Sequence, residues 1–307
     1  MRRRNATIRR VLFSTTVNWL CAFALTGSLM ASQPNADGKR DPRTEVGCVE
    51  NQHGLLVTIA VREIPSLRCD IWCYEDQLGK PVSHKKDGGT LVLTHRLNGA
   101  TVTSRFEPTD DGAEIRVEVS GPDAESVREV GSLNPCCQFH DADAFGNRGD
   151  YVEDFVARCF VFLEDGLTLL KDTRRVPGTR ERKDDKANLA QSWIQEYFPA
   201  WRKHPGQIPG QRGYSLDRPV YPLIGCVSQD GKYLAAIAWP EARSLGQVWH
   251  DCLHPRPAIG ESYNEEANRT VSRGRVYFLP NDEAVLLAAF KRDFPDWRRP
   301  DQIEQPR

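Results

Sequence analysis

Apolar residues recur at alternate positions through most of the chain. The segment Ala113–Val119 is the clearest case, because charged and apolar side chains change places at every step, as in a half-solvated antiparallel strand. Similar runs bounded by Gly, Pro, Asp or Asn lie at Leu55–Val61, Ser66–Tyr74, Thr90–Leu93, Ala100–Phe106, Val156–Leu163, Leu167–Leu170, Leu223–Val227, Tyr233–Trp239 and Val271–Leu279. This pattern predicts a protein built mainly from short β-strands.

Two turn sequences predict hairpins between neighbouring strands. Glu164-Asp165-Gly166 and Ser228-Gln229-Asp230-Gly231 each separate two strand-like runs. The Asp-Gly dipeptide in each supplies the positive φ that a tight turn requires.

Helical patterns are few. Asn281 is a typical N-cap residue, and the apolar stripe that follows it ends at Pro295, so one packing helix is predicted there. Shorter helices are predicted at Ala124–Glu129 and Ala187–Tyr197. Many strands with few helices predict a mainly β fold, an antiparallel β-sandwich with a few short helices.

The N-terminus follows the order of a secretory signal peptide. Five arginines among residues 1–10 precede an apolar run, and small residues follow it. Polar residues between Ser14 and Asn18 leave that run short of the roughly 20 residues of a spanning helix. A lipid-attachment site has a small residue before its cysteine, whereas Leu20 precedes Cys21. We therefore predict export to the periplasm, cell surface or extracellular space, with no membrane span after cleavage.

The chain is predicted to hold one folded domain. The predicted organisation is a signal peptide at 1–31, a disordered tether at 32–46, a single β-sandwich domain at 47–295 and a C-terminal tail at 296–307. An alternative, in which residues 48–130 form a separate smaller sheet, stays open.

Charge and cysteine content narrow the classes of partner. With 41 basic and 42 acidic residues, the net charge of −1 gives no long-range field to attract nucleic acid or an anionic membrane. Cleavage of the signal peptide removes Cys21 and leaves eight cysteines, an even number that is compatible with disulfides in an oxidising compartment. Their number does not indicate which of them pair, and several are equally compatible with buried thiols.

The order of several sequence blocks carries a resemblance over about half of the chain. The blocks are Asp217–Pro219, Leu223–Lys232, Ala236–Trp239, His250–Pro255, the Gly260-Glu261 turn, Arg273–Phe278 and Phe290–Pro295. In this order they resemble a group of exported bacterial proteins with a galactose-mutarotase-like β-supersandwich. The resemblance implies a sugar-facing β-sandwich and no defined reaction. The histidine signature of the epimerase itself is not found here, so its catalytic residues are not carried over.

His140 is a candidate general acid or base. It stands beside Asp141 and Asp143, and a carboxylate neighbour can fix the tautomer of a histidine whose pKa is near neutral. A strand-end histidine bonded to backbone is the alternative. The same segment also resembles part of a calcium loop, but Phe145 occupies a ligand position, so a calcium site is not predicted.

A second cluster, His250, Cys252 and His254, lies on one face of a predicted strand and has the softness that suits zinc. Successive ligands on one strand face lie about 6 to 7 Å apart, which is too far for one tetrahedral ion without a bulge. A disulfide from Cys252, with Cys226 as the candidate partner, is the preferred interpretation. The sequence therefore predicts no metal site and no cofactor.

Residues 171–220 break the strand rhythm and combine aromatic with basic side chains. Sugars stack on aromatic rings while charged groups hold their hydroxyls, so this segment is the candidate ligand loop. The predicted ligand-binding residues, with one from the later cluster, are Trp193, Trp201, Arg202, Tyr214, Arg218 and Trp249. A lid packed onto the sandwich is the structural alternative.

Three functional hypotheses follow. The first is an exported carbohydrate-binding β-sandwich. The second is a carbohydrate-active enzyme (epimerase, lyase or hydrolase), for which the candidate catalytic residues are His140, His250, Glu196 and Asp217. The third is a structural or interaction module of the cell envelope without a small-molecule site. An enzyme should bring a histidine and a carboxylate together in one cleft, whereas a binder should present aromatic rings without that pair.

Overall fold

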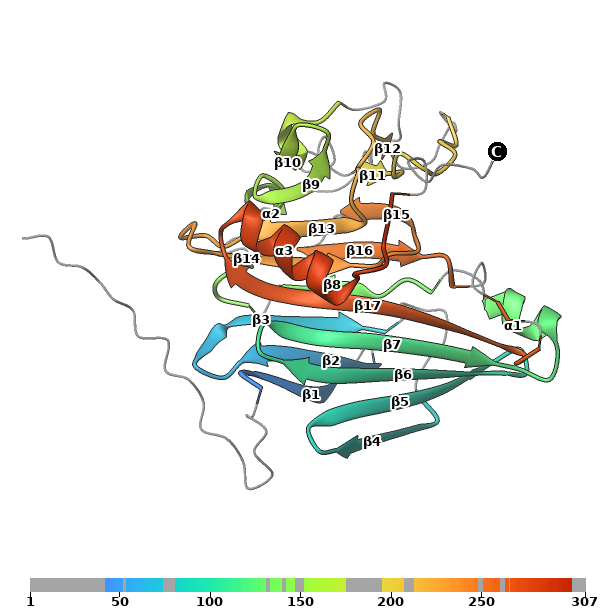
Figure 1. Cartoon of the computed structure of the whole chain (residues 1–307). Helices are drawn as coiled ribbons and strands as arrows, with labels where there is room; N and C mark the ends of the chain where they lie inside the picture. The colour runs from blue at the N-terminus through green and yellow to red at the C-terminus, as the bar shows by residue number, and fades with distance from the viewer. Residues whose placement is uncertain are drawn as a thin grey trace, which may run out of the picture. The chain divides into compact units, whose positions relative to one another are not determined.

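The computed structural model of the chain places its strands in two sheets (Figure 1). It describes residues 42–51, 54–73, 81–130, 133–139, 142–146, 152–174, 195–206, 213–247, 251–259, 263–264 and 266–299. All of them belong to the unit Asp41–Arg307. Among these described residues, no helix has the length and apolar character needed to cross a membrane.

The two sheets are mainly antiparallel. One has eight strands in the order β1 (Thr44–Asn51), β2 (Gly54–Val61), β3 (Ile64–Trp72), β8 (Cys136–Gln138), β16 (Cys252–Pro257), β15 (Ala242–Gln247), β11 (Gln195–Tyr197) and β12 (Gly213–Tyr214). The other has nine in the order β10 (Gly166–Leu169), β9 (Cys159–Leu163), β13 (Leu223–Val227), β14 (Tyr233–Ala238), β17 (Arg269–Pro280), β7 (Gly112–Ser120), β6 (Ala100–Thr109), β5 (Thr90–Leu97) and β4 (Ser83–Asp87). The pairing of β11 with β12 is parallel.

Strands from early and late parts of the chain share both sheets. In the eight-stranded sheet β3 pairs with β8, which pairs with β16, and in the nine-stranded sheet β7 pairs with β17. The early strands β1 to β7 therefore do not form a sheet of their own. Strand β1 already begins at Thr44, inside the segment predicted as a tether, because Val46 is buried in the core.

The core lies between the inner faces of the two sheets. Period-two alternation places every second residue of β7 there, as the sequence pattern predicted, and Ile115, Val117 and Val119 are all buried. The same alternation in β9 puts Cys159 and Val161 in this core and Phe160 on the outer face. The predicted mainly β sandwich is confirmed.

Helix α3 (Glu283–Asp293) covers the outer face of the nine-stranded sheet (Figure 1). Its Phe290 packs with Phe160 of β9 and Tyr277 of β17 in a second apolar cluster. The helix is the one predicted, but its N-cap is Asp282, whose carboxylate accepts hydrogen bonds from Ala284 N and Val285 N. The predicted N-cap was one residue too early, because the Asn281 side chain bonds instead to the carbonyl of Gly231.

The shorter elements match the predictions made from the sequence only in part. Both predicted hairpins form, and Gly166 and Gly231 in their turns have positive φ. Helix α1 (Ala124–Val130) matches its prediction, whereas α2 (Val152–Val156) was not predicted. The helix predicted at Ala187–Tyr197 is wrong at its described end, since residues 195–197 form strand β11, which pairs with β12 and β15.

Candidate functional site

A groove of about 620 Å³ runs along α3 on the outer side of the nine-stranded sheet. Two half-buried rings, Tyr221 and Trp297, stack there with centroids 5.5 Å apart and planes 27° apart. Phe162 of β9 and Phe290 and Phe294 of α3 also line it. This volume falls within the range of about 300 to 1,000 Å³ that is usual for small-molecule sites.

Charged side chains surround these aromatic rings. Those among the lining residues are Glu164, Glu283, Lys291, Arg298 and Arg299. Arg299 forms an ion pair with Glu164 at 2.7 Å, while Glu283, Lys291 and Arg298 are exposed. The groove therefore combines aromatic faces with acceptors and donors that reach solvent.

An ion-pair network around the buried Arg275 holds the C-terminal end of α3 on the sheet. Arg275 of β17 contacts Asp111 at 2.7 Å and Asp293 at 3.2 Å, and Arg292 contacts both carboxylates at 2.7 Å. Burial acts to raise the pKa of Asp111, but the hydrogen bond from Arg292 and the charge of Arg275 hold it below its ordinary value. This network positions the helix that forms one wall of the groove.

Among the described members of the predicted ligand-binding set, Trp201 contacts a residue that lines the groove. Its ring meets that of Trp297 edge to face, with centroids 5.7 Å apart, and it is half-buried. Trp201 thus supports the ring that lines the groove and is not itself one of the lining residues. Trp297 had been placed in the predicted C-terminal tail.

The two predicted arginines hold backbone carbonyls. Arg218 donates from Nε to Phe198 O at 2.6 Å and from Nη2 to Pro199 O at 2.6 Å, and burial lowers its pKa. Arg202 donates to the carbonyls of Glu241 and Ala242, both at 3.2 Å. Both guanidinium groups thus fix the loop against its neighbours, as the structural alternative for this segment described.

Tyr214 and Asp217 also have partners within the protein. Tyr214 is buried, and its ring packs edge to face on Phe198 at 5.2 Å. The carboxylate of Asp217 accepts hydrogen bonds from Arg174, at 2.6 Å from the backbone N and 2.7 Å from Nε.

Glu196 lies on the outer face of the other, eight-stranded sheet. It is buried on β11, where the Ser244 hydroxyl donates to its Oε1 at 2.5 Å and Arg256 Nε lies 3.7 Å from the same oxygen. In the sheet, Gly246 stands between Glu196 and His254. Glu196 and Asp217 were both predicted as catalytic carboxylates. In the structure, Ser244 and Arg256 hold Glu196, whereas Arg174 holds Asp217.

Four predicted site residues, His140, Trp193, Trp249 and His250, lie outside the described residues. Sequence reasoning missed Tyr221, Trp297 and the charged rim. The available signal was the aromatic content around Pro295, but the helix before it was interpreted only as a packing element.

The eight cysteines at Cys48 and beyond form no disulfide in the structure. Cys226 and Cys252, the predicted candidate pair, point in different directions, because Cys226 is in the core between the sheets whereas Cys252 is on the outer face of the eight-stranded sheet. Cys136 and Cys137 point to opposite faces of their strand, as adjacent strand residues do.

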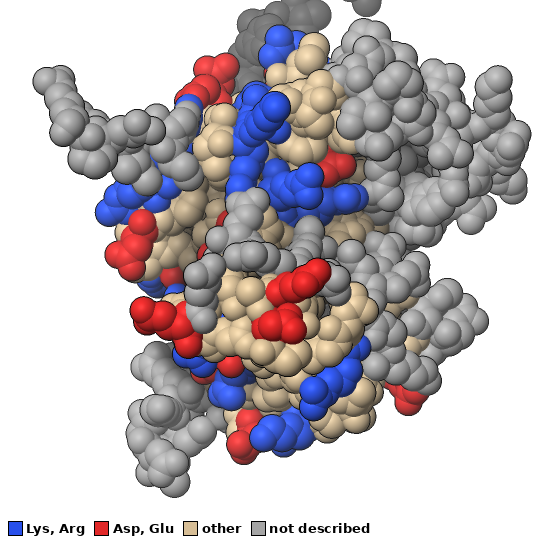
Figure 2. Space-filling model, turned by 90° about the vertical axis from the view of Figure 1, so that its right-hand side faces the viewer, with Lys and Arg blue, Asp and Glu red and all other residues tan. Residues whose placement is uncertain are grey.

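Charges of both signs are mixed over the described part of the face that Figure 2 shows. Lys and Arg lie beside Asp and Glu there.

Comparisons with known proteins give a structural likeness but no family. No family model matches the chain, and no curated protein matches it. Among solved structures, it is similar to a galactose mutarotase-like protein from Lactobacillus casei ATCC 334, with a TM-score of 0.36 and 9% sequence identity, over 76% of this chain and 99% of that chain. A likeness of this size carries no conclusion about ligand or reaction.

Proposed function

We propose that the protein is an exported carbohydrate-binding β-sandwich that holds a saccharide in the groove along α3. The observation that carries the proposal is the stacked pair Tyr221 and Trp297 inside a groove with a charged rim. Saccharides present C–H faces that pack on aromatic rings and hydroxyls that bond to charged groups, and this groove supplies both. Export rests on the signal-peptide pattern of residues 1–31.

Binding is favoured over catalysis at this groove. Its lining contains carboxylates and cations but, among the described residues, no histidine. The histidine and carboxylate that we required of an enzyme are therefore not brought together here, whereas the groove does present a pair of half-buried aromatic rings, as a binder should.

A glycan array probed with the purified protein, followed by calorimetry on any saccharide it retains, tests the proposal. We expect Trp297→Ala to weaken binding by at least about tenfold, or about 1.4 kcal/mol, because the stacking surface is lost. Lys291→Ala removes one exposed rim charge and should weaken binding by a smaller factor without disturbing the core.

Val285→Ala is the matched control, since Val285 is exposed on the same helix and does not line the groove. It should bind as the wild type does. The proposal is wrong if the array retains no saccharide, or if Trp297→Ala and Lys291→Ala both bind the retained saccharide as strongly as Val285→Ala.

A further inference from the structure

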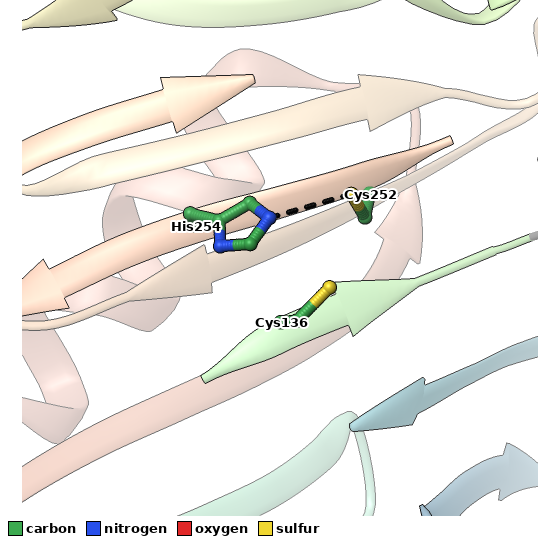
Figure 3. Close-up of side chains that lie close together, drawn as sticks. All are labelled: Cys136, Cys252 and His254. Carbon is green, nitrogen blue, oxygen red and sulfur yellow. Dashed lines mark hydrogen bonds between the residues drawn. The ribbon is translucent and has the colours of Figure 1, made fainter. Parts of the chain in front are cut away.

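Three soft ligands converge on the outer face of the eight-stranded sheet, away from the groove. Cys252 and His254 are two residues apart on β16 and share one face, and Cys136 comes from the adjacent strand β8 (Figure 3). The Sγ atoms of the cysteines and a ring nitrogen of His254 all lie within 4.8 Å of one another. All three residues are at most 1% exposed.

Their spacing is close to that of a metal site. Zinc bonds of about 2.3 Å to sulfur and about 2.0 Å to nitrogen place neighbouring tetrahedral ligand atoms about 3.5 to 3.8 Å apart. Cys252 Sγ already lies 3.3 Å from His254 Nε2. Cys136 Sγ lies within 4.8 Å of both of these atoms.

The histidine is oriented as a metal ligand. His254 Nδ1 lies 3.0 Å from Asn134 Oδ1, and because a carbonyl oxygen can only accept, the ring proton is on Nδ1. The lone pair is then on Nε2, which faces the sulfurs. A hydrogen bond from the second ring nitrogen to a carbonyl group is the usual support of metal-binding histidines.

Cys136 has a partner that stabilises sulfur with negative charge. Gln138 Nε2 donates to Cys136 Sγ at 3.4 Å from the next position on the same strand face. Thiolate is the form of cysteine that binds metals. In this cluster the imidazole is therefore held in an orientation suited to metal binding, and one sulfur accepts a hydrogen bond that stabilises its thiolate form.

Charge balance favours a divalent ion, and cysteine with histidine is a ligand set typical of zinc. Two thiolates and a neutral imidazole sum to two negative charges, which a divalent cation cancels, and a buried site strongly favours a neutral sum. Monovalent copper would leave one charge uncompensated. We propose that Cys136, Cys252 and His254 bind a zinc ion.

The proposed site differs from the sequence-based expectation of no metal. That expectation considered ligands from one strand only, namely His250, Cys252 and His254. The long imidazole reaches along β16 to its neighbour Cys252, which closes the gap between alternate residues, and the third ligand comes from the paired strand. A bulge is therefore not needed.

The test is metal binding by the full chain, reduced and metal-free, under anaerobic conditions. We expect one Zn²⁺ per chain by equilibrium dialysis and metal analysis. Co²⁺ should give thiolate-to-metal charge-transfer absorption, which Zn²⁺ then removes. Cys136→Ala, Cys252→Ala and His254→Gln should each weaken zinc binding by more than about a hundredfold.

Cys137→Ala is the matched control, because Cys137 is the next residue, is equally buried and faces the core. It should bind zinc as the wild type does. Asn134→Leu leaves all three ligands in place and should weaken zinc binding by about ten- to a hundredfold, so the proposal remains testable if a ligand variant does not fold.

Three results would overturn the zinc site. They are substoichiometric zinc in the wild type, wild-type affinity in the ligand variants, and a Cys136–Cys252 disulfide in the protein as purified, mapped by mass spectrometry without reduction. None of these bears on saccharide binding, which uses other residues on the opposite sheet.

Discussion

The outer faces of the two sheets differ although both sheets share one inner core. The nine-stranded sheet presents aromatic and aliphatic side chains outward, and α3 covers them. On the outer face of the eight-stranded sheet, several polar side chains are buried. Among them are Asp70, Glu196, Ser244 and His254. Apolar packing therefore dominates the outer face of the nine-stranded sheet. Hydrogen bonds between polar side chains and the proposed metal ligands dominate the outer face of the eight-stranded sheet.

The cysteines show the same division within one strand. Cys137 faces the core, where burial and the neighbouring Cys69 thiol raise its pKa, so it stays a neutral thiol. Cys136 faces outward, where the hydrogen bond with Cys252 lowers its pKa against the effect of burial. Identical residues at adjacent positions thus serve packing in one case and ligand chemistry in the other.

The largest effect is expected from the ion-pair network under α3. Asp111→Asn removes a carboxylate from the buried Arg275, whose side chain is 8% exposed, and should lower the free energy of unfolding by about 3 kcal/mol at neutral pH. Urea unfolding measures this loss. Asp110→Asn changes an exposed neighbour and should alter stability by less than about 0.5 kcal/mol.

At acid pH, the difference in the free energy of unfolding between the wild type and Asp111→Asn should become smaller. Since the pKa of Asp111 is lower in the folded state, its contribution is present above its ordinary pKa of 3.8 and is lost as pH falls below that value. A difference in stability that stays constant between pH 7 and pH 3 would contradict this account of the network.

Alanine substitutions at two glycines, one on each outer face, allow the packing of the two faces to be compared. A Cβ at Gly225 of β13 would clash with the Phe160 ring and lie 2.7 Å from the carbonyl oxygen of Ala235. A Cβ at Gly246 of β15 would meet its nearest atoms, Arg256 Nε and His254 Cβ, at 3.8 Å. We therefore expect Gly225→Ala to cost about 1 to 3 kcal/mol and Gly246→Ala less than about 0.5 kcal/mol, measured by denaturant unfolding. Equal losses would show that the polar face is packed as tightly as the apolar one.

The sequence predicted what depends on local pattern. Alternation identified strands such as β7, Asp-Gly dipeptides identified both hairpins, and an apolar stripe identified α3. Each of these signals lies within a few residues of chain. The cap residue was missed by one position, because Asn281 and Asp282 have equally suitable side chains.

The candidate sites could not be predicted in the same way, because they depend on pairing between distant segments. His254 and Asn134 are 120 residues apart, and the register of β16 with β8 brings them together. The groove likewise joins Tyr221, which precedes β13, to Trp297, which follows α3. Period-two alternation states which face a side chain occupies but not which strand is its neighbour.

The smallest expected effect is the coupling between the two proposed sites. They lie on opposite outer faces, and stacked sheets are about 10 Å apart, so contacts at one site are not shared with the other. Energetic coupling between sites so separated is usually below about 0.5 kcal/mol, which is about a twofold change in affinity.

Zinc affinity measured on Trp297→Ala should therefore equal that of the wild type within about twofold, and Cys136→Ala should retain saccharides as the wild type does. A tenfold change in either measurement would mean that the core transmits strain between the faces. The core between the sheets would then couple the two sites energetically, and the outer faces of the two sheets could not be treated as independent.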